Sequence, residues 1–597
     1  MNMYEFYVGQ VFDAYEYLGA HVSEAGTMFR TFAPGAKGIC VLHKGREIPM
    51  QRVYDGNFYE LFLADAAEGD LYEYRIYTQN GGYTDHCDPY GFGMEVRPEH
   101  KSVIRNLYQY EFQDAEWLAQ RTNCLDRPLN IYELHMGSWR RKEDGEWYHY
   151  DELAEPLIAY LKESGYNYVE LLPISEHPCD ESWGYQNTGF FAPTSRYGSA
   201  KELMHFIDLL HQNGIGVIVD FVLVHFAVDA YALAHYDGTA LYEYPHHDVG
   251  VSEWGSYNFM HSRGEVRSFL QSCANYWLRE FHFDGIRMDA ISRIIYWQGE
   301  ERRGENKNAI DFLRVMNGGL KVRNPGCMLI AEDSTNYPGV TKEVSRGGLG
   351  FDYKWDLGWM HDTLEYFQSL PEQRMERYHK LTFSMMYYWN ECYLLPLSHD
   401  EVVHGKATIL QKMSGEYEMK FPQGRALYMY MMMHPGKKLN FMGNEIGQLR
   451  EWDERRQQDW ELRKYPVHDS FYHYMAKLNE IYLKHPALSA RDYAEDGFLW
   501  LDCHQESRCL YAILRRGEGE MVAAVFNFGG EKQCGYAVEI PGMKGFAVEL
   551  YSDWECYSGK TAEDVEVCRV EDGRLVCDLA AFSGVLLLVE TKEEIEG

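Results

Sequence analysis

The sequence is organised around one short stretch, Phe283-Asp-Gly-Ile-Arg-Met-Asp289. Its apolar residues predict a short buried strand, and its Asp-Gly pair marks a backbone kink or a close approach. Arg287 and Asp289 are two residues apart, so on a strand their side chains point to the same side. A guanidinium keeps a neighbouring carboxylate ionised, and an ionised aspartate at a strand end is a candidate nucleophile. For this stretch alone, a structural ion pair is an equally good interpretation.

Seven more strand candidates lie between residues 129 and 443, at residues 130–135, 168–173, 217–222, 328–332, 351–355, 393–398 and 438–442. Amphipathic stretches, such as residues 201–212 and 265–281, lie between many of them. Eight strands alternating with helices predict an α/β fold, a (β/α)8 TIM barrel. The span is long for a bare barrel, so we expect insertions, the clearest at residues 231–257.

The chain on either side of the barrel reads as all-β. Short alternating or apolar runs occur at residues 27–32, 38–42, 58–63 and 72–77, and again at 498–501, 509–514, 521–526 and 584–589. Asn80-Gly81-Gly82 predicts a hairpin. We therefore predict an N-terminal β-sandwich (1–108), a catalytic barrel with insertions (109–487) and a C-terminal β-sandwich (488–597). The charge-dense tail, residues 590–597, is expected to fray.

The acidic composition of the chain restricts which kinds of molecule it is expected to bind. Lys and Arg number 57 against 91 Asp and Glu, a net charge of −34, which repels nucleic acid and anionic membranes and favours a neutral substrate. The N-terminus has no basic start and apolar run, and no stretch of about 18 apolar residues occurs, so we expect neither a signal peptide nor a membrane span. Thirteen scattered cysteines without a CxxC pair indicate reduced thiols and a cytoplasmic protein.

Charged side chains follow four of the predicted strands. They are Asp220 and His225, Arg287 and Asp289, Glu332, and His399 with Asp400. Active sites of TIM barrels are built at the carboxyl ends of the strands. Singly, each residue reads as a helix cap or an ion pair; together they predict one catalytic pocket.

Two mechanisms are compatible with this set. Glycosyl transfer needs a carboxylate nucleophile and a protonated carboxyl acid. Metal-assisted hydrolysis would instead use His225, Asp289, Glu332 and His399 as ligands. We favour glycosyl transfer, because an arginine beside the central aspartate disfavours a cation and no HxH or HExxH pair is present.

Four stretches resemble the signature regions of the α-amylase superfamily, namely residues 220–225, 285–289, 331–335 and 397–404. Further stretches resemble the 1,4-α-glucan (glycogen) branching enzymes: Tyr132-Glu-Leu-His-Met-Gly-Ser-Trp139, Trp183-Gly-Tyr-Gln186, and residues 350–363, 399–406, 434–438 and 443–448. The resemblance covers nearly the whole chain, including both flanking sandwiches.

The resemblance implies a catalytic trio. Asp289 would be the nucleophile that forms a covalent β-glucosyl intermediate, and Glu332 the general acid and then the base. Asp400 would hold ring hydroxyls and stabilise the transition state. The implied reaction cleaves an α-1,4-glucan, such as glycogen or an amylose-like chain, and transfers the fragment to a glucose 6-hydroxyl. An α-glucan hydrolase, amylolytic or debranching, is the alternative with the same trio.

The resemblance also implies five substrate-binding residues. His225 and His399 would hydrogen-bond hydroxyls of one sugar, and Tyr185 would stack on its ring. Arg287 would keep Asp289 charged, and Asp220 would order the site. No cofactor and no metal are implied, and we expect a monomer.

The sequence departs from the family pattern at three places. Val224 replaces the asparagine that binds calcium in many amylases, so we expect no structural calcium there. Residues 41–46 lack the usual tryptophan loop of the N-terminal sandwich, which predicts that this sandwich does not bind glycan in the usual way. Asp333 stands where branching enzymes commonly have a second glutamate.

Overall fold

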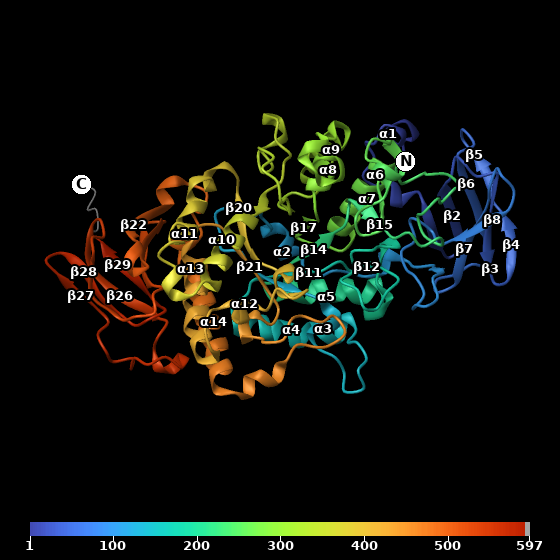
Figure 1. Ribbon diagram of the computed structural model, residues 1–597. Helices are drawn as coiled ribbons and strands as arrows, with labels where there is room; N and C mark the ends of the chain where they lie inside the picture. Colours follow the sequence, from blue (N-terminus) through green and yellow to red (C-terminus); the bar gives the residue numbers. More distant parts are fainter. Residues whose placement is uncertain (592–597) are drawn as a thin grey trace. The chain divides into compact units, whose positions relative to one another are not determined.

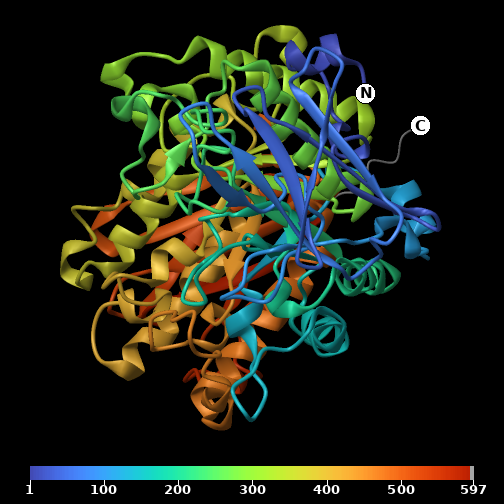
Figure 2. The ribbon, with the colours of Figure 1, turned by 90° about the vertical axis from the view of Figure 1, so that its right-hand side faces the viewer.

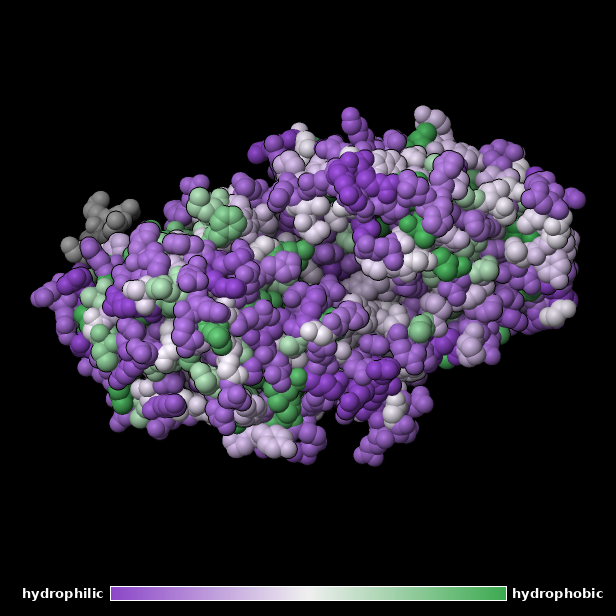
Figure 3. All heavy atoms as spheres, viewed as in Figure 1, coloured by the Kyte–Doolittle hydropathy of each residue, from purple (hydrophilic) through white to green (hydrophobic). Residues whose placement is uncertain are grey.

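The computed structural model describes residues 1–591, which form two compact units. The first contains Met1–Asn123, His135–Ile158 and Glu170–Asp352, and the second contains Cys124–Leu134, Ala159–Val169 and the chain from Tyr353 on. The predicted fraying of the tail lies mostly outside the described residues. Hydrophilic side chains cover most of the face seen in Figure 3, as expected for a strongly acidic chain.

Eight strands form a closed barrel, and all eight were predicted from the sequence. They follow in chain order: β10 (Asn130–Leu134), β11 (Tyr168–Leu171), β14 (Gly216–Phe221), β17 (Gly285–Met288), β18 (Met328–Ala331), β19 (Tyr353–Trp355), β20 (Tyr393–Leu397) and β21 (Lys437–Phe441). Every residue of these strands is buried. Parallel barrel strands are covered on both faces, which explains why they appear in the sequence as apolar runs rather than as alternating patterns.

The predicted helices are present beside the strands (Figure 1). α5 (Ala200–Gln212) begins at a capping box formed by Ser199 and Glu202, in which the side chain of each residue accepts a hydrogen bond from the backbone amide of the other. α7 (Gly264–Glu280) agrees with its predicted range to within one residue. The predicted insertion, residues 231–257, contains only the short helix α6 (His247–Gly250) before the strand β16 (Tyr257–Asn258).

Two sheets form the N-terminal sandwich, drawn in blue in Figure 2. One has the order β1-β2-β6-β5: β1 (Gly19–Ser23), β2 (Gly26–Phe32), β6 (Phe58–Leu63) and β5 (Gln51–Val53). The other has the order β4-β3-β7-β8, with β9 (Ser102–Val103) also on β7: β4 (Arg46–Pro49), β3 (Gly38–His43), β7 (Leu71–Tyr77) and β8 (Tyr83–His86). The hairpin predicted at Asn80-Gly81-Gly82 joins β7 to β8.

Two sheets also form the C-terminal sandwich. Its larger sheet has the order β22-β23-β24-β29-β26: β22 (Phe498–Gln505), β23 (Leu510–Gly517), β24 (Glu520–Asn527), β29 (Ser583–Thr591) and β26 (Met543–Tyr551). The smaller has the order β25-β28-β27: β25 (Gln533–Val538), β28 (Arg574–Leu579) and β27 (Cys568–Glu571). The four predicted strands of this region are confirmed, and the alternate residues Leu510, Ala512 and Leu514 of β23 are fully buried in its hydrophobic core.

Within residues 1–591, no helix is long and apolar enough to cross a lipid bilayer.

The start of β17 is held by a buried histidine between two aspartates. His211 Nδ1 lies 2.8 Å from Asp114 and Nε2 lies 3.0 Å from Asp284. Asp284 also accepts from the indole of Trp117 and from the amide of Val217, both at 2.8 Å. Burial lowers the pKa of His211, but the two carboxylates outweigh it and raise the pKa to about 9. The histidine is therefore a cation shared between two buried carboxylates, and Asp114 also contacts Nδ1 of His282 at 2.9 Å.

The predicted close approach beside Asp284 is also present. A β-carbon on Gly285 would lie 2.9 Å from both the carbonyl oxygen and the β-carbon of Met328 on the neighbouring strand β18. Only glycine fits there without movement of that strand.

We expect His211→Gln to lower the free energy of unfolding by about 3–5 kcal/mol at neutral pH, because it leaves buried Asp284 without its cation and Asp114 with His282 alone. The pKa is raised in the folded state, so this contribution is fully present below about pH 6.5 and is lost as the pH rises through about 9. The unfolding midpoints of wild type and variant, measured by circular dichroism, should therefore differ less at about pH 10 than at about pH 6. The control is His473→Gln, an exposed histidine beside Asp469. An equal difference at both pH values would contradict this assignment.

Candidate active site

In the first unit, one buried guanidinium contacts three carboxylates. Arg287 Nη1 lies 2.7 Å from Asp220 and 2.8 Å from Asp289, and Nη2 lies 3.4 Å from Glu332. The arginine side chain has no exposed surface, whereas those of Asp289 and Glu332 are 16% and 18% exposed. Burial lowers the pKa of Arg287, but the surrounding carboxylates raise it well above its usual value. The site therefore keeps a permanent positive charge between its acids.

Backbone hydrogen bonds lock the ends of the three strands that carry these acids. The amide of Asp289 donates to the carbonyl of Phe221 (3.3 Å), and the amide of Glu332 donates to that of Met288 (3.1 Å). Ala290 has the left-handed φ of 45°, which is uncommon for a residue with a side chain. Its amide donates to Glu332 Oε2 at 2.7 Å. One oxygen of Glu332 is thus fixed relative to Asp289.

Asp220 is almost fully buried and accepts two hydrogen bonds at one oxygen. The donors to Oδ2 are the hydroxyl of Tyr185 and Arg287 Nη1. Burial raises the pKa of Asp220 to about 6, with Arg287 opposing the shift and the nearby Asp289 adding to it. The hydroxyl of Tyr185 also accepts from Arg287 at 3.2 Å. These contacts suit Asp220 to an ordering role, which stays a prediction, as does stacking of Tyr185 on a sugar.

His225 begins the short strand β15 (His225–Phe226), which pairs with β16. Its side chain is buried, and in the described part of the chain Nδ1 has no hydrogen-bond partner. Burial lowers the pKa of His225 to about 4, with Asp289 opposing and Arg293 adding to the shift. A neutral imidazole is suited to hydrogen-bond a hydroxyl group.

The second unit contains the remaining predicted residues, His399 and Asp400, at the start of η10 (His399–Val402) directly after β20. Buried Glu133 on β10 holds the histidine: its Oε2 accepts from the His399 amide at 2.8 Å and its Oε1 lies 2.6 Å from Nδ1. A carboxylate only accepts, so Nδ1 carries a proton, and Nε2 lies 3.6 Å from the carboxylate of Asp400. Asp400 is 48% exposed.

Sequence reasoning missed Glu133 and the backbone role of Ala290. Glu133 lies within the quoted stretch at residues 132–139, and a carboxylate inside a buried strand was the available signal. Nothing in the sequence marks Ala290, because a left-handed alanine has no compositional signature.

Within residues 1–591, three of the ligands named for the metal-dependent alternative do not form a group that could hold an ion. Among residues 1–591, one group of His, Asp and Glu side chains is close enough together to hold an ion, formed by His149, Asp151 and Glu202. Within that same range His225, Asp289 and Glu332, all in the first unit, form no such group.

Three family models match the chain. They are the carbohydrate-binding module 48 (isoamylase N-terminal domain) over residues 17–91, the α-amylase catalytic domain over residues 154–240, and the α-amylase C-terminal all-β domain over residues 500–590. Each matched range lies inside one of the three domains predicted from the sequence, whose boundaries stay a prediction.

Curated relatives are similar over almost the whole chain. The 1,4-alpha-glucan branching enzyme GlgB of Nitrosomonas europaea is 43% identical over 585 residues, covering 94% of this chain and 80% of the relative. The enzymes of the same name from Geobacillus stearothermophilus and Bacillus subtilis are each 41% identical, covering 93% and 94% of this chain and 89% and 91% of their own lengths. The chain belongs to the 1,4-alpha-glucan branching enzyme family.

Solved structures extend the likeness in fold beyond the branching enzyme family. A pullulanase from Bacillus acidopullulyticus has a TM-score of 0.74 at 18% identity, covering 96% of this chain and 74% of the other. A pullulanase from Paenibacillus barengoltzii, in complex with maltohexaose and α-cyclodextrin, has a TM-score of 0.75 at 18% identity, covering 99% and 97%. At this identity the likeness shows a shared fold only.

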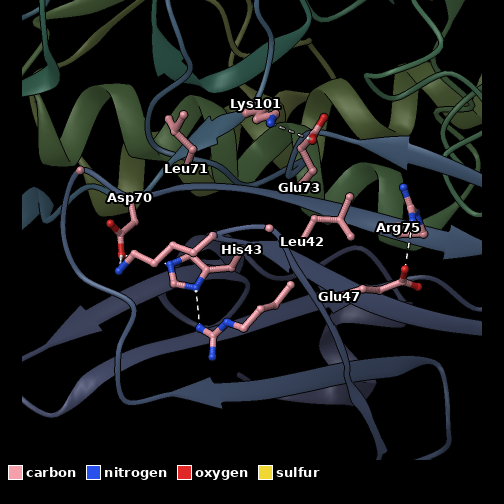
Figure 4. A pocket seen from close by; sticks show the side chains of 12 residues that line it. Leu42, His43, Glu47, Asp70, Leu71, Glu73, Arg75 and Lys101 are labelled. Atoms are coloured by element: carbon pink, nitrogen blue, oxygen red, sulfur yellow. Dashed lines mark hydrogen bonds and ion pairs between the residues drawn. The ribbon is translucent and has the colours of Figure 1, made fainter.

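The N-terminal sandwich of this branching enzyme family member replaces the missing tryptophan loop by a tight turn. Lys44 and Gly45 both have positive φ, at 50° and 72°, and join β3 directly to β4. Beside the turn lies a pocket of about 590 Å³ (Figure 4). Its lining includes the ion pairs Arg75–Glu47, Lys44–Asp70 and Lys101–Glu73, and none of its lining residues is Trp, Tyr or Phe. The pocket therefore has no Trp, Tyr or Phe ring on which a sugar could stack.

We expect Arg287→Met to lower the free energy of unfolding by about 3–5 kcal/mol, because it removes the cation that contacts Asp220 and leaves that carboxylate buried. The loss of stability is measured by comparing thermal unfolding of the wild type and the variant, monitored by circular dichroism. Arg302→Met is the matched control, since Arg302 is 85% exposed and pairs with the surface residue Glu300. If both variants unfold at the wild-type temperature, Arg287 is not the centre of this site.

Proposed function

We propose that this chain is a glucan-branching transferase that cleaves an α-1,4 bond in a glucan and transfers the released chain to a glucose 6-hydroxyl, forming an α-1,6 branch. The observation that carries the proposal is the placement of Asp289 and Glu332. They follow neighbouring parallel strands, β17 and β18, and contact the same guanidinium, in a chain that belongs to the branching enzyme family.

The two acids would divide the first step between them. Asp289 attacks the anomeric carbon and forms a glycosyl ester, while Glu332 gives its proton to the departing 4-oxygen. In the second step Glu332 takes the proton of an incoming 6-hydroxyl, whose oxygen displaces Asp289, so the anomeric configuration is retained. Arg287 Nη1 donates to Oδ1 of Asp289 at 2.8 Å, and the amide of Ala290 fixes Oε2 of Glu332.

The remaining roles are carried over from the family resemblance. Asp400 would stabilise the oxocarbenium-like transition state through ring hydroxyls, and His225 and His399 would hydrogen-bond hydroxyls of the reacting glucose. Glu133 would support this role by holding Nδ1 of His399. Tyr185 would contact the sugar ring.

The proposed setting is the cytoplasm, with glycogen or an amylose-like chain as partner and no cofactor. All thirteen cysteines, each within residues 1–591, are free thiols, which suits a reducing compartment.

We expect Asp289→Asn to lower kcat by about 10⁴-fold or more, because the nucleophile is lost. Glu332→Gln should lower kcat by about 10²- to 10⁴-fold, because an amide neither gives nor takes the proton. Both are measured by the fall in iodine staining of amylose. The control is Asp311→Asn, an acid on the surface that is 60% exposed. Unchanged turnover in Asp289→Asn would show that Asp289 is not the nucleophile, whereas a wild type without turnover would leave a non-catalytic glycan-binding protein as the better interpretation.

The same assay separates transfer from hydrolysis. Branching lowers iodine staining with little new reducing sugar, whereas an amylolytic or debranching hydrolase releases reducing ends in proportion to the bonds that it cleaves. Abundant reducing sugar would therefore overturn the transferase assignment while keeping the catalytic pair.

We expect prolonged dialysis against EDTA to leave the branching rate unchanged, because both chemical steps are assigned to carboxyl groups. Loss of activity that added divalent metal restores would instead support the metal-assisted mechanism.

A further inference from the structure

A half-exposed tryptophan lies beside His225 in the first unit. Trp254 is 48% exposed, although tryptophan is highly buried on average. Its ring centroid lies 5.2 Å from that of His225, with 48° between the planes. Trp254 has no role in the two proposed chemical steps, formation of the glycosyl ester and its transfer. We therefore asked whether its exposed ring could contact the substrate.

The loop that carries Trp254 is tightly hydrogen-bonded. Ser252 Oγ accepts from the amides of Trp254 and Ser256, both at 3.2 Å, and the amide of Ser252 donates to the carbonyl of Ser256 at 2.8 Å. Gly255 closes the turn by donating to the carbonyl of Ser252 at 3.1 Å. The loop therefore presents the indole in one backbone conformation.

A second element orients the indole itself. Arg293 belongs to α8 (Ser292–Ile295), which follows Asp289 within three residues and is labelled with α6 and β15 in the green part of Figure 1. Its guanidinium carbon lies 4.4 Å from the centroid of Trp254, within the range of a cation–π contact. Arg293 is anchored in turn by the carboxylate of Glu253 and the carbonyl of Gln298.

Gln298 ties the two elements together. It has a left-handed φ of 57°, and its side-chain amide donates to the carbonyls of Asp248 (2.8 Å) and Val251 (2.9 Å). Its Oε1 accepts from Asn258 at 3.2 Å. Gln298, in the segment after Asp289, is thus hydrogen-bonded to the chain both before and after Trp254.

From this arrangement we propose that Trp254 is a sugar-binding platform, which takes a glucose unit of the α-1,4-glucan next to the unit bound at His225. This inference rests on the proposed function. An aromatic ring with an apolar face suits the C–H face of a glucose unit, and Arg293, whose guanidinium carbon lies over the ring, supplies a charged donor for hydroxyls. Arg293 follows the proposed nucleophile Asp289 by only four residues. Its contact with the indole therefore links the position of Trp254 to the segment that carries the nucleophile. The platform would make the enzyme prefer chains over single sugars or short oligosaccharides.

The test uses the full chain in the inactive Asp289→Asn background, with maltohexaose as ligand and calorimetry as readout. Adding Trp254→Ala should raise the Kd by about tenfold, as expected for the loss of one aromatic contact. Trp254→Phe should restore most of the affinity. In the active enzyme, Trp254→Ala should raise the KM for amylose more than it lowers kcat. Tyr54→Ala, at a 66% exposed tyrosine of the N-terminal sandwich, is the control for removal of a surface ring.

Two outcomes would overturn the proposal. One is an unchanged Kd and KM in Trp254→Ala while the wild type branches amylose. The other is a lowered unfolding temperature in Trp254→Ala together with no rescue by phenylalanine, which would make Trp254 a packing residue. A wild type that binds maltohexaose through Trp254 but does not branch amylose would keep the platform and reject the proposed function instead.

Discussion

The first unit depends on the burial of one positive charge, that of Arg287. A buried charge is costly unless it is paired and hydrogen-bonded, and this guanidinium is paired with Asp220, Asp289 and Glu332. The pairing requires one strand register, in which Asp220 lies opposite Arg287. A slip by one residue would turn the arginine to the other face of the sheet. The interaction that holds the strands in register is therefore the same one that contacts Asp289 and Glu332.

The barrel was predictable from the sequence because its strands are buried on both faces and end in charge. All eight candidates are present, and the two-residue spacing of Arg287 and Asp289 correctly placed both side chains on one side of β17. These features depend on local periodicity and on the rule that strand ends share one face of a barrel.

Features that depend on contacts between distant segments were not predictable. The pair of Glu133 and His399 joins residues 266 apart in the chain. The left-handed backbone of Ala290 and the placement of Trp254 beside Arg293 depend on how two loops pack. Neither has a compositional signal, because alanine and tryptophan occur in many settings. The sequence was therefore informative about the acids proposed to react and uninformative about the groups that orient them.

The contacts of Asp284 with His211 and Trp117 limit where the N-terminal sandwich could be exchanged for another domain. The segment around Asp114 and Trp117 precedes the first barrel strand, yet it provides part of the hydrogen bonding at the start of the fourth. Exchange of the N-terminal sandwich for another module would preserve the barrel only if the junction fell before Asp114. A junction placed after Trp117 would remove the indole and one carboxylate, and the histidine would be left with half of its partners.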